Sequence, residues 1–355
     1  MKENWLIYGA TGYTGRLVAE EAVRRGHRPV LAARSCGKLD AISTELSLDS
    51  IVLRLDDADR LEHVVGDFQV VFHTAGPFIR TSQPMLAACL RTGTHYLDIT
   101  GELKVLERIL GMDREAKEAG IVVIPATGFD VTPTDCLSVY VAGKLPGADR
   151  LEIGFSGLSH ASAGTVLSGL DQDPPLQFYS RQKGRLVAFP PGLGGKKIRF
   201  LDRERYAIPI PWGDLTTAYW STGIENITTY MAMNPKMAQG LRIFGPSIEG
   251  MLQSHLLRNA LKKIAGNVIQ GPDKHTRQTA RSQIWAHTRN AQGETAEAWI
   301  ETLEAYQLTA VSGVCSVEKV LAGAVHPGAF TPAQAFGPDF VLEFPRTRRF
   351  DHLPD

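Results

Sequence analysis

Short apolar runs alternate with stretches of helical spacing through the first half of the chain. The runs occupy residues 5–10, 28–34, 50–56, 68–76, 94–100 and 120–128. Between them apolar residues recur at helical spacing, as in the groups Leu17, Val18, Ala22, Val23 and Met85, Leu86, Cys89, Leu90. Strands that alternate with helices typically form a parallel sheet with helices on both faces. We therefore predict an α/β fold for residues 1–148, a Rossmann-type doubly wound parallel sheet.

The pattern changes after Leu151. Apolar runs bounded by turn residues predict strands over residues 151–158, 185–190, 196–201, 206–211, 215–222 and 227–233. Residues 282–306 predict a β-hairpin whose turn runs from Asn290 to Gly293. We expect a second, α+β domain over residues 149–306 with a largely antiparallel mixed sheet. A helical pattern over residues 308–324 predicts that residues 307–355 return to the first domain as a helix and a tail.

Residues 235–268 carry an amphipathic helical pattern that Gly245 and Pro246 are expected to interrupt. The apolar stripe consists of Leu252, Leu256, Leu257, Leu261 and Ile264. The basic residues Arg258, Lys262 and Lys263 lie beside it. Such a stripe is typical of a helix packed on a core. It also fits a lid or an element that lies on a membrane surface, and the sequence leaves these alternatives open.

Composition argues against several classes of partner. Lys plus Arg and Asp plus Glu number 38 each, so the net charge gives no reason to expect nucleic acid or an anionic membrane. The chain opens without a signal-peptide pattern, and no apolar run approaches the ~20 residues of a membrane span. The ten histidines form no ligand-spaced cluster, so we expect no metal. The scattered cysteines favour a reducing, cytoplasmic location; they are Cys36, Cys89, Cys136 and Cys315.

The loop after the first apolar run has the spacing of a dinucleotide-binding turn. Gly9, Gly12 and Gly15 lie between the first predicted strand and the first predicted helix. Glycines there allow a tight turn, the approach of a pyrophosphate and close packing of the helix on the strand. The predicted cofactor contacts in this loop are Gly9, Ala10, Thr11, Gly12, Tyr13, Thr14 and Gly15.

The end of the second predicted strand indicates which dinucleotide binds. An NAD site usually carries Asp or Glu there, whereas this chain has Arg34, with Ser35 and Lys38 close behind. A guanidinium can bind a 2′-phosphate through two parallel hydrogen bonds, so we predict NADP(H) as the cofactor. Asp56, at the end of the third predicted strand, is expected near the adenine. Ala75, Gly76 and Pro77, after the fourth strand, are expected near the nicotinamide half of the cofactor.

Three segments resemble the saccharopine dehydrogenase-like oxidoreductases: residues 73–78 (HTAGPF), 93–103 (GTHYLDITGEL) and 126–142 (ATGFDVTPTDCLSVYVA). The resemblance extends more loosely to residues 162–170, 211–227 and 331–341, and is nearest to a branch beside the trans-acting enoyl reductases. It implies a nucleotide-binding first domain, a second domain with a mixed sheet, and a small organic substrate in the cleft between them. Val131 and Thr132 depart from the family pattern, in which a serine and a small residue are common.

Two acidic residues in these segments are candidates for catalysis. Glu102 and Asp130 each follow an apolar run, so both are expected at the carboxyl edge of the sheet, where ligands bind in open α/β folds. Hydride transfer to a C=O, C=N or enoyl group needs a proton donor or a polarising group beside the acceptor. A structural role, capping the following helix or ordering the loop, fits each residue equally well.

Two other functions fit parts of the sequence. Tyr140 and Lys144 have the spacing of the catalytic pair of short-chain dehydrogenases, with Thr127 upstream near the position of that family's serine. The other alternative is a non-catalytic regulatory protein that binds NADP, because a fold does not determine a function. The resemblance also implies a homodimer, with the sheet of the second domain as its interface.

Overall fold

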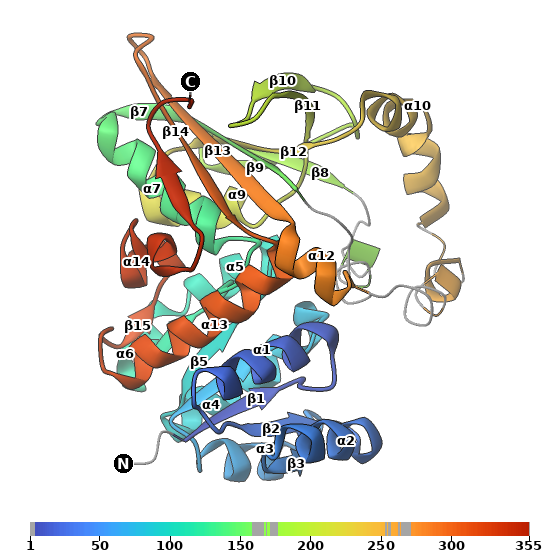
Figure 1. Ribbon diagram of the computed structural model, residues 1–355, viewed down its shortest axis with the longest axis vertical. Helices are drawn as coiled ribbons and strands as arrows, with labels where there is room; N and C mark the ends of the chain where they lie inside the picture. Colours follow the sequence, from blue (N-terminus) through green and yellow to red (C-terminus); the bar gives the residue numbers. More distant parts are fainter. Residues whose placement is uncertain are drawn as a thin grey trace. The chain divides into compact units, whose positions relative to one another are not determined.

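The computed structural model describes residues 4–157, 177–252 and 271–354, together with residues 167, 169–170, 254, 257–261 and 263. The chain divides into two compact units, whose elements are labelled in Figure 1. Unit 1 contains residues 1–129 and 306–336, and unit 2 contains residues 130–305 and 337–355. Most of the loosely family-like segment 162–170 lies outside the described residues.

Unit 1 is built on a seven-stranded sheet with the strand order β15-β6-β5-β4-β1-β2-β3. All neighbouring strands are parallel, which confirms the predicted doubly wound sheet. Each apolar run of the first half supplies one strand, and β15 joins the sheet from the C-terminal part of the chain. The strands are β1 (Trp5–Tyr8), β2 (Val30–Ala33), β3 (Ser50–Val52), β4 (Val70–His73), β5 (His95–Asp98), β6 (Val122–Ile124) and β15 (Gly328–Ala329).

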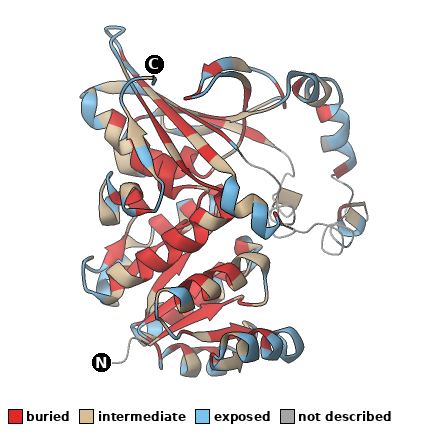
Figure 2. Ribbon diagram, in the orientation of Figure 1, coloured by how far each residue is buried: buried red, intermediate tan, exposed pale blue. Residues whose placement is uncertain are grey.

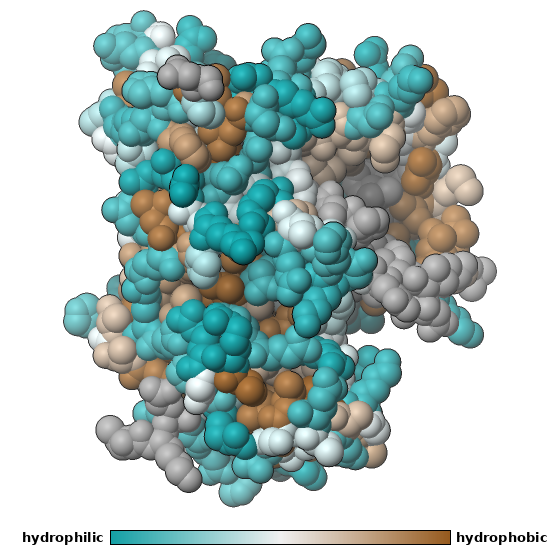
Figure 3. All heavy atoms as spheres, in the orientation of Figure 1, coloured by the Kyte–Doolittle hydropathy of each residue, from teal (hydrophilic) through white to brown (hydrophobic). Residues whose placement is uncertain are grey.

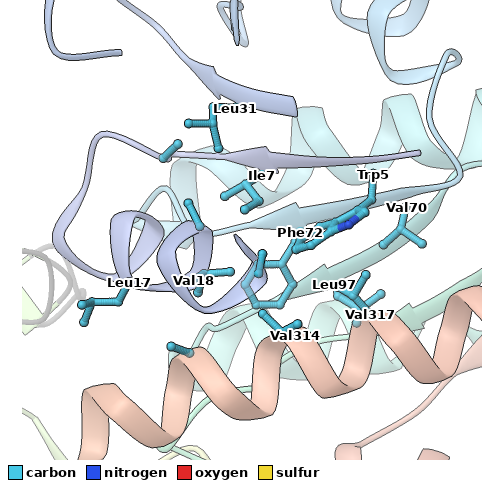
Figure 4. Close-up of a cluster of buried hydrophobic side chains, with 14 of the residues drawn as sticks. Trp5, Ile7, Leu17, Val18, Leu31, Val70, Phe72, Leu97, Val314 and Val317 are labelled. Carbon is cyan, nitrogen blue, oxygen red and sulfur yellow. The ribbon is translucent and has the colours of Figure 1, made fainter. Parts of the chain in front are cut away.

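Helices on both faces bury the sheet of unit 1. They are α1 (Tyr13–Arg24), α2 (Cys36–Leu46), α3 (Ala58–Val65), α4 (Phe78–Thr92), α5 (Leu103–Leu110), α6 (Asp113–Glu118), α13 (Ala305–Leu321) and α14 (Pro332–Phe336). Leu6 and Ile7 enter different apolar cores because successive strand residues point to opposite faces. Figure 4 shows Val314 and Val317 of α13 in the same core as Phe72. From Tyr306 onward, helix α13 belongs to unit 1.

Unit 2 contains a nine-stranded mixed sheet with the main order β10-β11-β12-β7-β13-β14-β16, and β8 joins β12 to β9. Strands β12 and β7 are parallel and the other pairs are antiparallel, as predicted for a largely antiparallel mixed sheet. The predicted hairpin is β13 and β14, in which Trp285 faces Trp299. The strands are β7 (Ala148–Ser156), β8 (Phe178–Gln182), β9 (Arg185–Phe189), β10 (Lys196–Arg199), β11 (Glu204–Pro209), β12 (Asn226–Ala232), β13 (Arg281–Asn290), β14 (Thr295–Leu303) and β16 (Arg348–Phe350).

The helices of unit 2 lie against this sheet or extend from it. They are α7 (Thr132–Lys144), α9 (Asp214–Thr222), α10 (Pro235–Leu252), α12 (Lys274–Thr279) and the 3-10 helix η1 (Phe340–Glu343). Helix α7 packs on β13 and β14, and α9 packs on α7 and β12. Figure 2 shows buried residues concentrated in the central strands and α7, with exposed residues along much of α10.

The two units differ from the predicted domains at both ends of the second one. The sequence assigned α7 to the first domain, whereas its packing on β13 and β14 places it in unit 2. Residues 337–355, predicted to return to the first domain, also belong to unit 2, because Phe350 of β16 pairs with Trp299 of β14. Both differences arise from contacts between residues far apart in the sequence.

Residues 215–222 form most of helix α9, so the predicted strand is wrong. Threonine and aromatic residues favour strands, and they dominate this segment. The helix ends at Gly223, whose φ of 72° suits glycine. Residues 214–218 are all buried, so tertiary packing around this part of the helix outweighs the intrinsic preference.

Helix α10 runs unbroken from Pro235 to Leu252, so the predicted interruption at Gly245 and Pro246 is wrong. Gly245 serves close packing instead, since a Cβ atom there would lie 3.0 Å from the Cβ of Pro191. Arg258 is buried and its Nε donates to the carbonyl of Leu252, although the sequence placed it off the apolar stripe. Within the described residues, no helix combines the length and apolar character needed to cross a membrane. Two residues of the predicted stripe, Leu256 and Ile264, and Lys262 beside it lie outside those residues.

Candidate cofactor site and proton donor

The glycine loop makes a tight turn between β1 and α1. Gly9 has a φ of 93°, and a Cβ atom there would lie 2.7 Å from the backbone nitrogen of Ala75. A Cβ atom at Gly15 would lie 2.3 Å from the carbonyl oxygen of Gly9. Side chains at these two positions would therefore force the loop open. Gly12 is exposed, so its backbone is accessible to a ligand.

The N-terminus of α1 fits a pyrophosphate. Its first turn contains no acidic residue, and its N-cap, Gly12, supplies no side-chain hydrogen bond. The first amides of a helix lack partners within the helix, and the helix dipole adds a partial positive charge there. Ala10 is buried in the core, so only its backbone can face a ligand. The ring of Tyr13 packs edge-on against Tyr306, with 5.0 Å between centroids.

Arg34 lies directly after β2 and is exposed, as are Ser35 and Lys38. Among the residues that the structure describes, the side chains of these three form no hydrogen bond or ion pair. No acidic residue occupies the first turn of α2, which begins after Ser35. Burial raises the pKa of Tyr8 to about 12, and the positive charge of Arg34 opposes this shift. These observations leave cationic side chains at the end of β2 available to a phosphate.

Asp56 is paired with Arg54, a residue that the sequence analysis missed. The guanidinium of Arg54 donates two hydrogen bonds to the carboxylate, at 2.9 and 2.6 Å. Hydrogen bonding to Arg54 lowers the pKa of Asp56. Both side chains are about two-thirds exposed, at 66% and 67%. The predicted adenine contact, Asp56, is therefore hydrogen-bonded to the guanidinium of Arg54.

The loop after β4 is held in place by two threonines that the sequence analysis also missed. The hydroxyl of Thr74 donates to the carbonyl of Tyr8 at 2.9 Å, and that of Thr81 donates to the carbonyl of Ala75 at 2.6 Å. Nε2 of His73 lies 3.0 Å from Oγ1 of Thr81. Burial lowers the pKa of His73 to about 3, so its ring is neutral. The predicted nicotinamide loop, residues 75–77, thus starts from a fixed position.

Glu102 binds the N-terminus of α4, not that of the helix that follows it. Its two carboxylate oxygens accept hydrogen bonds from the backbone amides of Phe78 and Ile79, each at 2.8 Å. The side chain is buried and makes no capping bond to α5. Hydrogen bonds from amides favour the ionised form of a carboxyl group. Glu102 is therefore arranged to hold a helix end beside Pro77 rather than to give up a proton.

Asp98 joins the loops that follow β5 and β6. It accepts hydrogen bonds from the amides of Thr100 and Ala126, both at 2.9 Å, and from the hydroxyl of Tyr96 at 2.7 Å. Burial raises the pKa of Asp98 to about 6, and the hydrogen bonds work in the opposite direction. Asp98 thus orders the loop that leads into residues 126–130.

Asp130 has different surroundings from Glu102. Its carboxyl group is partly buried and forms no hydrogen bond with the described residues. It does not cap α7, whose N-cap is Val131. Burial raises the pKa of Asp130 to about 7. The preceding residue, Phe129, is fixed by a hydrogen bond from its amide to the hydroxyl of Thr309 at 3.0 Å. A carboxyl group that titrates near neutrality and has no partner is suited to proton transfer.

A second unusual carboxyl group, Asp214, lies in unit 2 and was not predicted. Oγ1 of Thr134 is 2.9 Å from the carbonyl oxygen of Val131 and 2.8 Å from Oδ2 of Asp214. The hydroxyl has a single hydrogen, so both contacts are satisfied when Asp214 is protonated and donates to Thr134. Burial, together with the charges of Asp135 and Asp130, raises the pKa of Asp214 well above its usual value. Its Oδ1 is buried without a partner.

Tyr140 and Lys144 bind the C-terminal tail. The hydroxyl of Tyr140 donates to Asp351 at 2.8 Å, and Nζ of Lys144 lies 2.7 Å from the same carboxylate. The guanidinium of Arg349 covers the ring of Tyr140 at 3.5 Å. All four residues belong to unit 2, and the Lys144–Asp351 pair is exposed to solvent. These contacts give the pair a structural role and disfavour the short-chain dehydrogenase alternative. Within the described part of the chain, no group of three or more His, Cys, Asp or Glu residues could hold a metal ion.

Comparisons with known proteins agree with this geometry. Residues 5–124 match the family model of the saccharopine dehydrogenase NADP-binding domain. A trans-acting enoyl reductase of Mycobacterium leprae is 38% identical over 143 residues, which is 38% of this chain and 34% of that protein. Protein Rv2449c of Mycobacterium tuberculosis, provisionally named for the same activity, is 35% identical over 190 residues, 48% of this chain and 45% of that protein. The chain thus matches less than half the length of these relatives.

Among solved structures, apo saccharopine dehydrogenase (L-Glu forming) from Saccharomyces cerevisiae covers 98% of this chain and 99% of its own, with a TM-score of 0.67. At 13% sequence identity this similarity shows a shared fold and no more. The resemblance to the saccharopine dehydrogenase-like oxidoreductases that the sequence motifs indicated is therefore confirmed, in sequence for residues 5–124 and in fold for nearly the whole chain.

Proposed function

We propose that this protein is an NADP(H)-dependent oxidoreductase that transfers a hydride between the cofactor and a small organic substrate with a C=O, C=N or enoyl group. The observation that carries the proposal is Arg34, an exposed cation at the end of β2 that forms no ion pair with the described residues. The matched NADP-binding family and the names of the relatives support the cofactor and the reaction class. From the sequence, we also propose that the substrate is held between the two domains and that the protein is cytoplasmic.

Each element of the site has a role in this proposal. The glycine loop and the N-terminus of α1 bind the pyrophosphate, and Arg34, assisted by Ser35 and Lys38, binds the 2′-phosphate. Glu102 holds the amides of α4, which fixes the end of the nicotinamide loop. When bound, the reduced nicotinamide supplies the hydride.

Asp130 is the proposed proton donor. With a pKa of about 7 it is partly protonated at neutral pH. Its proton passes to the substrate atom that becomes negative as the hydride arrives, and the resulting carboxylate recovers a proton from solvent. Glu102 is the weaker candidate because its carboxylate already accepts two backbone hydrogen bonds.

Cofactor titrations test the first half of the proposal. NADPH should quench the intrinsic fluorescence at lower concentration than NADH. Arg34→Gln should raise the Kd of NADPH by about 10- to 100-fold, since it removes charge-assisted hydrogen bonds to a phosphate, and leave that of NADH unchanged. Arg114→Gln, at an 80% exposed position on α6, removes the same charge and should change neither constant. Equal affinity of the wild type for the two cofactors would refute the assignment.

Turnover tests the second half and separates it from the regulatory alternative. NADPH oxidation is followed with panels of carbonyl, imine and enoyl compounds. The proposal requires oxidation with at least one class and its loss in Asp130→Asn, with folding and NADPH affinity retained. Tight NADPH binding without oxidation in any panel would favour the non-catalytic alternative.

A further inference from the structure

A second arginine, Arg54, follows a strand at the same sheet edge as Arg34. Strands β2 and β3 are parallel, with Ala33 paired to Val52, and the amide of Leu53 donates to the carbonyl of Ala33 at 2.9 Å. Arg34 and Arg54 therefore follow the carboxyl ends of two neighbouring strands. In open α/β sheets this is the edge at which ligands bind.

The charges of both arginines act on one hydroxyl group at this edge. The hydroxyl of Tyr8 donates to the carbonyl of Leu53 at 3.3 Å, so this side chain reaches from β1 past β2 to the end of β3. Burial raises the pKa of Tyr8 to about 12, and the positive charges of Arg34 and Arg54 oppose this rise. Both guanidinium groups therefore lie near the same point of the sheet edge.

The ion pair between Arg54 and Asp56 leaves one edge of the guanidinium unused. Nε and Nη2 of Arg54 donate to the two carboxylate oxygens, and Nη1 donates to no described residue. The two bonds to Asp56 fix the plane of the guanidinium. The edge formed by Nη1 and Nη2 keeps N–H groups for a second pair of parallel hydrogen bonds, the geometry with which arginine binds phosphate.

Stability does not account for this ion pair. Its side chains are about two-thirds exposed, and hydrophilic residues cover much of the face of unit 1 that Figure 3 shows. An exposed ion pair contributes little to stability because water screens its charges. The pair has two other effects: it neutralises Asp56, a carboxylate that by itself repels a phosphate, and it holds the guanidinium of Arg54 in one orientation.

We propose that Arg54 and Arg34 together bind the 2′-phosphate of NADP(H), and that Asp56 orients Arg54 for this contact. This inference rests on the proposed function and adds to it a second residue that selects NADP(H) over NAD(H). Each guanidinium supplies a fork of N–H donors to the phosphate oxygens, which a lysine cannot do. Asp56, which the sequence predicted near the adenine, then acts through Arg54.

Titrations of two variants with NADPH and NADH test the proposal. Arg54→Gln should raise the Kd of NADPH by about 10-fold without raising that of NADH, because it removes charge-assisted hydrogen bonds to the phosphate alone. This substitution also uncovers the charge of Asp56. The double variant Arg54→Gln/Asp56→Asn removes both charges and is as neutral at this site as the wild-type ion pair. Its Kd for NADPH should therefore stay at least about 5-fold above that of the wild type.

The ion pair between Arg91 and Glu62 provides a matched control. Nη2 of Arg91 lies 2.6 Å from Oε1 of Glu62, and the two side chains are 53% and 34% exposed. Arg91 is in the last turn of α4, which leads into β5 and so ends at the opposite edge of the sheet. Arg91→Gln and Arg91→Gln/Glu62→Gln should bind both cofactors like the wild type. Adenosine 2′,5′-bisphosphate and adenosine 5′-monophosphate, which lack the nicotinamide, should repeat the difference between NADPH and NADH in every variant.

Three results would overturn the proposal: wild-type affinity for NADPH in Arg54→Gln, recovery of that affinity in the double variant, or an equal loss of affinity for NADPH and NADH. Recovery in the double variant would mean that Arg54 only neutralises Asp56. Circular dichroism verifies that each variant is folded. Equal affinity of the wild type for the two cofactors would refute the proposed function itself. A preference for NADPH that is lost in Arg34→Gln but kept in both Arg54 variants would refute the role of Arg54 alone.

Discussion

Replacing Glu102 by glutamine tests whether this residue holds the nicotinamide loop or donates a proton. Both carboxylate oxygens accept backbone hydrogen bonds at 2.8 Å in a buried position. Glutamine keeps one acceptor oxygen and turns an N–H group toward the second amide, so one backbone donor loses its partner. A hydrogen bond to a charged group contributes about 1.5–3 kcal/mol, and an unpaired buried donor costs about 1–3 kcal/mol. We expect Glu102→Gln to lower the free energy of unfolding by about 2–4 kcal/mol.

Denaturant unfolding of the wild type and the variant measures this difference. Glu118→Gln is the control, because Glu118 is 68% exposed and its substitution should change stability by less than about 0.5 kcal/mol. We also expect a higher KM for NADPH, since Phe78 directly follows the loop at residues 75–77. A variant as stable as the wild type that has lost turnover would refute this reasoning and make Glu102 the proton donor.

Four further substitutions have defined outcomes. Gly15→Ala should destabilise the protein by about 1–3 kcal/mol because its Cβ atom would lie 2.3 Å from a carbonyl oxygen. In Gly12→Ala the new Cβ atom would lie 3.3 Å from the nearest atom, so this variant should fold and mainly weaken NADPH binding. Thermal melts compare the stability of the two variants, and titrations compare their affinity for NADPH. The pKa of Asp130 is about 7 in the folded protein, above the value of about 4 in the unfolded chain. Between these pH values the folded protein binds more protons than the unfolded chain, so the wild type loses stability as pH rises from about 4 to about 7. Asp130→Asn should remove that pH dependence in denaturant unfolding, and wild-type kcat/KM for reduction should fall above pH 7 as the donor ionises. Tyr140→Phe loses a surface hydrogen bond to Asp351, so it should cost less than about 1 kcal/mol and leave turnover unchanged; loss of turnover in a folded variant would restore the short-chain alternative.

Local signals in the sequence were enough to predict the nucleotide-binding part of the fold. The apolar runs correspond to strands β1 to β6 because the period of hydrophobic residues reflects burial on both faces of a parallel sheet. The turn at Gly9 to Gly15 was predictable because its backbone and close contacts demand glycine. Arg34 indicated the cofactor because it follows a strand end whose place in the fold was already known.

Segments whose conformation depends on distant contacts were not predictable in this way. Residues 215–222 have the composition of a strand, yet become a helix that packs on α7 and β12 and buries residues 214–218. The tail after Gly337 joins unit 2 through pairing of β16 with β14, which no local pattern of three residues could show.

The sequence by itself determined the α/β class, the glycine loop and the cationic end of β2, since each depends on neighbours along the chain. Only the tertiary structure decided how the acidic residues differ. Glu102 meets its amide partners 24 and 23 residues away, and Asp214 meets Thr134 across 80 residues. Asp130 has no such partner within the described chain, and burial alone moves its pKa to about 7. Protonation depends on burial and on long-range hydrogen bonds, and the order of residues along the chain does not specify either.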